Sequence, residues 1–84
     1  MVDLQKQGTY EKVVAVIAEV LTIPQNSIHP VSQFEGLGAD SLDTLEIIIK
    51  LEETFGIEIS DDEASKITTV QEAVSKIDEI LSKK

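Results

Sequence analysis

The residues whose types and spacing best suggest chemistry form one short stretch, Gly38-Ala39-Asp40-Ser41-Leu42-Asp43. Asp40 is a favourable N-cap residue, and Asp43 puts a second carboxylate in the first turn of the helix that would follow. Ser41 is therefore expected at or near the first helical position. Its hydroxyl would lie beside unpaired backbone amides and the positive end of a helix dipole, where a phosphate group is most easily held. The stretch predicts a covalent phosphodiester on Ser41, although the same residues taken alone are also an ordinary helix start.

Thiol and histidine chemistry find no support in the sequence. The chain has no cysteine, which excludes a disulfide, a thiolate nucleophile and a cysteine-based zinc site. Its single histidine, His29, stands before a proline in a predicted loop, so neither a two-histidine metal site nor an ordinary catalytic triad can be built around it. Any thiol chemistry must come from an added group.

The many acidic residues invite a metal hypothesis, which the calcium-loop template does not support. Placed over residues 35–46, the template puts Leu37 and Ala39 where oxygen ligands are required. Loose binding of divalent cations near Asp61 and Asp62 remains open, through charge density alone. Nothing in the sequence forms a pocket around paired carboxylates, so we expect neither catalytic residues nor a formed metal site.

A helix predicted from Ser41 to Phe55 must position the serine. At about 100° per residue its apolar side chains cover a wide arc, broader than packing on one side requires. Four should face the core: Ile47, Ile48, Leu51 and Phe55. Three more should be partly exposed among carboxylates: Leu42, Leu45 and Ile49. Such an apolar patch with an acidic rim is typical of a surface that docks partners.

The remaining elements predict an all-α fold, a small four-helix bundle with a long first loop, in one domain covering residues 1–84. Residues 1–8 should fray and end at Gly8, and Thr9 should cap a first helix. A long loop from Thr22 to Ala39 should be anchored by five apolar side chains, which are Ile23, Ile28, Val31, Phe34 and Leu37. Gly56 should end the second helix. Capping boxes at Ser60 and Thr69 should open a third helix too short to pass Ile67 and a longer last helix.

Negative charge is concentrated in one part of the chain. Residues 35–63 contain ten acidic residues and a single lysine, Lys50, and so hold the whole formal net charge of −9. The acidic and basic residues outside this segment cancel. Such a field repels nucleic acid and anionic membranes and attracts basic protein surfaces. The longest apolar runs span only a few residues, so no membrane span and no signal sequence are expected.

Residues 34–64 resemble the acyl carrier proteins of dissociated (type II) fatty-acid synthesis. The likeness rests on three segments, which are Phe-Glu-Gly-Leu-Gly-Ala-Asp-Ser-Leu-Asp-Thr-Leu-Glu, Leu-Glu-Glu-Thr-Phe-Gly-Ile-Glu-Ile and Asp-Asp-Glu-Ala. It continues through residues 67–70 and covers most of the chain from Thr9. The resemblance implies that a phosphopantetheinyl transferase moves 4'-phosphopantetheine from coenzyme A onto Ser41. The terminal thiol of that arm would carry growing fatty acyl chains as thioesters, and the chain itself would be no enzyme.

The resemblance, together with the charge pattern, also assigns surface and interior residues. The docking surface for the transferase and for synthesis enzymes with basic patches comprises Asp40, Leu42, Asp43, Leu45, Glu46, Ile49, Glu52, Glu53 and Asp61. Matched by position, the lining of the acyl cavity comprises Ile47, Leu51, Ile59, Ala64, Ile67, Ala73 and Ile77. Gln33 stands where many members carry an apolar side chain, which leaves the chain-length capacity open. We expect a monomer in the cytoplasm, or in an organellar stroma or matrix if a transit peptide has been removed.

Two alternatives remain open from the sequence. One keeps the carrier chemistry but changes the cargo to a polyketide, an amino acid or D-alanine. Ala39 and Asp40 before the serine and the dense acidic residues favour the fatty-acid type. The other is an acidic helical protein-interaction module whose helix start merely carries a serine.

Overall fold

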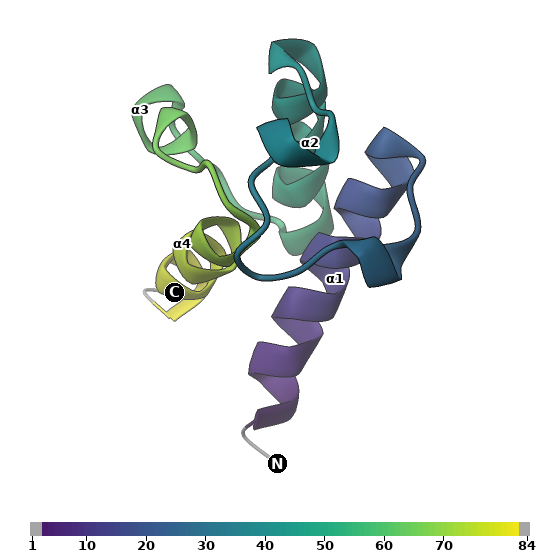
Figure 1. The fold of residues 1–84 in the computed structure, drawn as a ribbon. Helices are drawn as coiled ribbons and strands as arrows, with labels where there is room; N and C mark the ends of the chain where they lie inside the picture. The colour runs from purple at the N-terminus through teal and green to yellow at the C-terminus, as the bar shows by residue number, and fades with distance from the viewer. Residues whose placement is uncertain (1–2, 83–84) are drawn as a thin grey trace.

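The computed structural model describes the backbone of residues 3–82 and the side-chain environments of residues 8–82. Its longer elements are four α-helices: α1 (Asp3–Leu21), α2 (Ser41–Phe55), α3 (Asp61–Ser65) and α4 (Val70–Ser82). Two single-turn 3₁₀ helices, η1 (Gln25–Ser27) and η2 (Glu35–Leu37), lie in the long first loop. Helices α1, α2 and α4 surround the core, and the short α3 stands apart at the end of the bundle (Figure 1). The predicted all-α bundle with one short helix is confirmed.

Helix α1 begins earlier than the sequence predicted. It starts at Asp3, so Gly8 and Thr9 lie inside it and neither ends nor caps a helix. Glycine in a helix interior costs only about 1 kcal/mol relative to alanine, which is too little to end a helix that packing stabilises further on. The predicted start of the first helix at Thr9 is therefore wrong. The expected fraying of residues 3–8 stays a prediction, and the expectation for residues 1–2 lies outside the described residues.

Helix α2 begins and ends where the sequence predicted, because the residues at its two ends satisfy backbone groups. At the start, Asp40 and Asp43 form a reciprocal capping box, with the Asp43 amide 2.8 Å from Asp40 Oδ1. At the end, Gly56 adopts a left-handed conformation with φ of 65°. A side chain would disfavour that conformation, so glycine stops the helix there at little cost.

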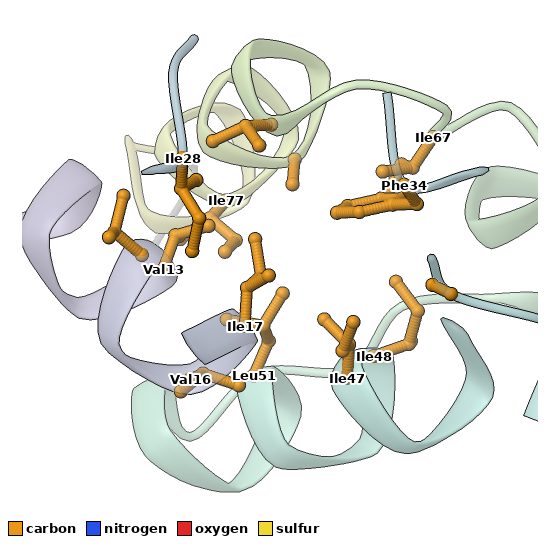
Figure 2. Close-up of a cluster of buried hydrophobic side chains, with 14 of the residues drawn as sticks. Val13, Val16, Ile17, Ile28, Phe34, Ile47, Ile48, Leu51, Ile67 and Ile77 are labelled. Atoms are coloured by element: carbon orange, nitrogen blue, oxygen red, sulfur yellow. The ribbon is translucent and has the colours of Figure 1, made fainter. Parts of the chain in front are cut away.

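The core lies where α1, α2 and α4 face one another. Its largest completely buried side chains come from all three helices: Val13, Ile17, Ile47, Leu51, Val70 and Ile77. Figure 2 shows most of these and neighbouring apolar side chains pointing toward one another, with Phe34 and Ile67 at one end of the cluster. Ile48 is buried as predicted, whereas Phe55 is half-buried at the edge of the core. No helix within residues 3–82 is long and apolar enough to cross a membrane.

Four of the five predicted loop anchors do pack inward, and one does not. Ile28 and Phe34 are buried, and Ile23 and Leu37 pack against the core as half-buried side chains. Val31, in contrast, is 78% exposed, so its prediction as an anchor is wrong. The Ser32 amide donates to the His29 carbonyl at 2.9 Å, which closes a tight turn and leaves Val31 at its tip.

Backbone pairing holds the long loop against the link between α3 and α4. Gln33 and Thr69 form an isolated antiparallel bridge, and the Phe34 amide donates to the Thr68 carbonyl at 3.0 Å. Further along, the Val70 amide donates to the Ser32 carbonyl at 3.0 Å. These bonds fix the loop just before η2, and Ala39, which follows η2, is buried. The loop therefore delivers residue 41 to a defined place on the surface.

Candidate functional site

Ser41 is the first residue of α2 and is exposed to solvent. The residue before it, Asp40, uses its carboxylate to cap the helix and its carbonyl to accept the Thr44 amide at 2.9 Å. Thr44 also donates its hydroxyl to that carbonyl at 3.0 Å. Within the described residues, no hydrogen bond engages the Ser41 hydroxyl. The hydroxyl is thus held in a fixed place and is available to an external reagent.

The electrostatics around Ser41 are mixed. The N-terminal end of α2 favours an anion, yet Asp40 and Asp43 place two carboxylates beside the same turn. Their charges offset part of the attraction that the helix dipole offers to a phosphate. A free phosphate would therefore gain little at this position, whereas a phosphate bonded covalently to the hydroxyl needs no such gain.

The predicted docking residues gather along α2 and at the start of α3. Three of them are large apolar side chains exposed in the folded protein: Leu42 at 74%, Leu45 at 53% and Ile49 at 45%. The exposed acidic members are Asp40, Glu46, Glu53 and Asp61. An exposed apolar row on a helix with acidic neighbours is the arrangement that the sequence predicted.

Two predicted docking residues also contribute to the fold. Asp43 is half-buried and accepts the Asp40 amide at 3.4 Å in the capping box. Glu52 is half-buried, and its Oε2 accepts the Ile59 amide at 2.8 Å, which ties the segment after α2 back onto the helix. Glu52 therefore has less freedom to bind a partner than Glu46 or Glu53.

The residues predicted to line an acyl cavity are packed together in the core. Ile47, Leu51, Ala73 and Ile77 are completely buried, Ile59 and Ile67 nearly so, and Ala64 packs against them. Of these, Ile67 borders both of the open cavities described next.

Two surface cavities flank the link between α3 and α4. The smaller, about 380 Å³, is lined by Gln33, Phe34, Glu35, Thr44, Ile67 and Thr68. The larger, about 610 Å³, lies between α3 and α4 and is lined on those helices by Glu63, Lys76 and Glu79 among others. Only the smaller cavity includes a residue of α2, and Thr44 follows Ser41 by three positions. The smaller cavity therefore reaches the first turn of α2, the turn that Ser41 begins.

Hydrogen bonds shift the pKa values of three groups in the α3–α4 region. The Ser60 backbone amide and the Lys76 ammonium lower the pKa of Glu63. The Thr68 amide and hydroxyl, both 2.8 Å from Glu72 Oε1, lower the pKa of Glu72. Lys76 lies 3.0 Å from Glu79 and 3.4 Å from Glu63, and these partners raise its pKa. Glu63 and Lys76 thus connect α3 to α4, and Glu72 binds the link that precedes α4.

Within the described residues, no group of three or more histidine, cysteine or acidic side chains could hold a metal ion. Asp61 and Asp62 are both exposed at the start of α3.

Comparison with known proteins identifies the family. A family model described as "Phosphopantetheine attachment site" matches residues 11–77, and Ser41 lies inside this range. An acyl carrier protein of Helicobacter hepaticus is 49% identical over 71 residues, which cover 83% of this chain and 93% of that protein. This chain belongs to the acyl carrier protein family. Its matched residues form the phosphopantetheine attachment domain of such carriers, and the family acts as a carrier and not as a catalyst.

Two plant relatives match 94% of this chain. "Acyl carrier protein 1, chloroplastic" of Casuarina glauca is 45% identical over 80 residues, and the protein of the same name from Cuphea lanceolata is 42% identical over 80 residues. The chain spans 59% and 57% of the length of these two relatives.

The residues present fit a phosphopantetheine group. Ser41 offers an exposed hydroxyl at a fixed helix start, and the smaller cavity presents polar side chains around Phe34 and Ile67. When bound, the group supplies a terminal thiol that this cysteine-free chain lacks.

Sequence reasoning predicted the position of Ser41 at the start of α2, the caps of α2 and α3 and the exposed apolar row, but it missed the small cavity. The cavity depends on backbone pairing between the loop and the α3–α4 link, which leaves no periodic signal in the side chains. The sequence offered one indication of the cavity: Gln33 is polar although it directly precedes Phe34, which is buried.

Proposed function

We propose that Ser41 carries the 4'-phosphopantetheine arm and that the chain transports growing fatty acyl groups as thioesters between the enzymes of fatty-acid synthesis. The observation that carries this proposal is the exposed Ser41 hydroxyl at the first position of α2, within the matched attachment domain. In the loading step, this hydroxyl bonds to the phosphorus that bears pantetheine in coenzyme A. The bond from that phosphorus to 3',5'-ADP breaks, and the hydroxyl proton is released.

A phosphopantetheinyl transferase is the expected modifying enzyme, with Asp40 and Asp43 among its contacts. Synthesis enzymes with basic patches would dock on the row formed by Leu42, Leu45 and Ile49 and on the nearby Glu46, Glu52, Glu53 and Asp61. Buried apolar contacts and opposite charges at a rim together favour a specific and fast encounter. We expect a monomer that carries no nucleic-acid site.

The cargo would enter the core that is closed in this structure. Because the helices are short and the core is small, separating α2 from α3 and α4 exposes little buried surface. Ile47, Leu51, Ile59, Ala64, Ile67, Ala73 and Ile77 would then line the acyl chain. The compartment, whether cytoplasm, stroma or matrix, stays a prediction; two of the matched relatives are described as chloroplastic.

The experiment is intact mass analysis after incubation with coenzyme A, magnesium and a broad-specificity phosphopantetheinyl transferase. The expected result is a gain of one phosphopantetheinyl group by the wild type and none by Ser41→Ala. Ser75→Ala is a matched control, because Ser75 is an exposed serine on α4, and it should load normally.

Absence of a gain on folded, unmodified wild-type protein would contradict the proposal and favour the acidic interaction module. A gain on Ser41→Ala would place the arm elsewhere. Once loading is established, transfer of malonyl groups and elongation by synthesis enzymes, compared with aminoacyl and polyketide loading, identifies the cargo.

A further inference from the structure

Lys76 lies at the seam between α3 and α4. Helix α3 stands apart at the end of the bundle (Figure 1), and the Lys76 ammonium ties it to α4 through Glu63, at 3.4 Å. The same ammonium lies 3.0 Å from Glu79 of its own helix. Only 24% of the Lys76 side chain is exposed, although it bears a charge. The seam is therefore closed by a charged group that is largely covered by protein.

Lys76 also stands at the edge of the buried face of α4. It follows Ala73 by three positions and directly precedes Ile77, and both of these residues are completely buried. Three helical positions bring a residue back to within about 60° of its starting direction. A lysine can lay its aliphatic stem along apolar surface while its ammonium stays at the protein surface. The stem of Lys76 thus leaves α4 beside the core, and its ammonium reaches the seam with α3.

The proposed acyl pocket has its smallest side chains at this seam. Five of the seven residues proposed to line the acyl chain are isoleucine or leucine, and the other two are Ala64 and Ala73. Ala64 belongs to α3 and Ala73 to α4, the two helices that Lys76 joins. An alkyl chain entering a packed core displaces the least side-chain volume beside alanine. We therefore expect its methyl end to advance toward the seam.

Open space lies on the outer side of the seam. The cavity of about 610 Å³ is bordered there by Glu63, Ile67, Lys76 and Glu79. Ile67 is only 5% exposed and belongs to the core, so Ile67 and Lys76 separate the core from this cavity. A hydrocarbon chain that passed between them would remove water from the ammonium and its carboxylate partners, which is unfavourable.

We propose that Lys76 ends the acyl pocket and thereby sets the longest chain that the carrier can hold inside its core. This inference rests on the proposed function, since it takes Ser41 as the attachment point and the core as the place of the acyl chain. Carbons of the cargo up to the seam are buried, and additional carbons leave part of the chain in water. Lys76 is then a specificity-determining residue for chain length.

A purely structural role for Lys76 predicts a different result. If the ion pairs of Lys76 only stabilised the fold, losing them would affect carriers of short and long acyl chains by the same factor. A wall at the end of the pocket acts only on chains long enough to reach it. The dependence on chain length therefore distinguishes the two roles.

The test measures how well the core protects thioesters of different lengths. Saturated acyl groups of six to eighteen carbons are loaded from acyl-coenzyme A by a broad-specificity phosphopantetheinyl transferase, and cleavage by hydroxylamine is followed by intact mass. A sheltered thioester reacts only while the chain is out of the core, so each buried methylene should slow cleavage by up to about fourfold. In the wild type, the rate should fall with length and then level off at the chain that meets Lys76.

Three variants test the wall. Lys76→Met replaces the charge with an unbranched apolar side chain and leaves Glu63 and Glu79 accessible to water. It should move the levelling point by at least one two-carbon step, so the first chain too long for the wild type should react up to about 15-fold more slowly. Lys76→Arg retains a cation and should keep the wild-type levelling point. Lys50→Met is the matched control, because Lys50 also pairs with a glutamate of another helix but borders neither cavity.

An unchanged levelling point in Lys76→Met, or a rate that changes by one factor at every length, overturns the proposal. So does a wild-type rate that keeps falling through eighteen carbons. The wild type also provides a check that needs no variant: the terminal methyl of the longest protected chain should show nuclear Overhauser contacts to the Lys76 methylenes, and their absence overturns the proposal.

The same samples distinguish this failure from failure of the proposed function. A wild type that gains no mass contradicts the attachment at Ser41. A gain of mass with cleavage rates that do not depend on chain length contradicts burial of the cargo in the core. Either result removes the basis of the inference, whereas protection with an unchanged levelling point in Lys76→Met contradicts the role of Lys76 alone.

Discussion

Two glutamates of α2, Glu46 and Glu53, differ in their surroundings from two glutamates of the α3–α4 region, Glu63 and Glu72. Glu46 and Glu53 on α2 are exposed, and no hydrogen bond or ion pair engages them within the described residues. Glu63 and Glu72 accept backbone amides at the starts of α3 and α4. The carboxylates of Glu46 and Glu53 are therefore solvated charges. Those of Glu63 and Glu72 accept hydrogen bonds from backbone amides that would otherwise lack partners.

The lysines sharpen this contrast. Lys76 lies between Glu63 and Glu79 and links α3 to α4. On α2 the single lysine, Lys50, lies 3.6 Å from Glu19 of α1. Lys50 and Lys76 thus each pair with a glutamate of another helix, while the exposed Glu46 and Glu53 beside Leu45 and Ile49 have no lysine partner within the described residues. A surface meant for basic partners has this distribution.

The largest expected effect is the difference in unfolding free energy between alanine substitutions at two leucines of α2. Leu51 is completely buried and Leu45 is 53% exposed. Leu51→Ala should lower the free energy of unfolding by about 2–5 kcal/mol, a large part of the stability of so small a domain. Leu45→Ala should change it by less than about 0.5 kcal/mol and should instead lower the kcat/KM of loading by the transferase. Urea unfolding followed by circular dichroism, with loading assays in parallel, measures both.

A loss of stability at Leu45→Ala comparable to that at Leu51→Ala would mean that the exposed row is part of the core. Ile49→Ala is a further control, since Ile49 is 45% exposed and should behave like Leu45.

The second prediction uses pH to separate the two groups of acids. Hydrogen bonds from Thr68 hold the pKa of Glu72 below its ordinary value of 4.5, so this carboxylate stabilises the folded state above that pH. The contribution is lost as pH falls through the lower, folded-state pKa, because both states are then protonated. Glu72→Gln should therefore lower the melting temperature at pH 7, and the gap from the wild type should narrow as pH falls below 4.5.

Glu53→Gln provides the matched comparison, because Glu53 is an exposed glutamate of α2. It should leave the melting temperature at pH 7 unchanged or slightly higher. Equal decreases for the two variants, or a gap for Glu72→Gln that does not narrow as pH falls below 4.5, would contradict the distinction between capping and surface acids.

Local chemistry made much of the fold predictable. Asp40, Ser60 and Gly56 act on backbone groups within four residues of themselves, so their effects can be read from adjacent letters. The wheel of α2 separated the buried Leu51 from the exposed Leu45 because its two faces differ in composition. These signals need no knowledge of the rest of the molecule.

The errors came where tertiary context decides. Gly8 looked like a helix end, yet α1 continues through it. Val31 looked like a loop anchor, but the turn from His29 to Ser32 turns it outward. The smaller cavity depends on a bond between Phe34 and Thr68, 34 positions apart, for which the sequence carries no local pattern.

The smallest expected effect concerns salt, which acts on the two regions in opposite directions. Screening weakens the pairs that Lys76 makes with Glu63 and Glu79, but exposed pairs of this kind contribute only about 0–1 kcal/mol each. Screening also weakens the repulsion among the ten acidic residues of segment 35–63, a segment that contains a single lysine. At 0.1 M salt the Debye length is about 10 Å, short enough to weaken most of these repulsions across the segment. Repulsion involves more groups than the ion pairs do, so the stability gained by weakening the repulsion should exceed the stability lost from the pairs. Moderate salt or magnesium should therefore raise the melting temperature by a few degrees, since about 1 kcal/mol corresponds to about 4–8 °C.

Calorimetry from 10 to 200 mM salt measures the rise. The double variant Glu46→Gln/Glu53→Gln should start higher and rise less, because fewer charges remain to be screened; a flat or falling melting temperature in the wild type would instead mean that the paired charges of α3 and α4 dominate.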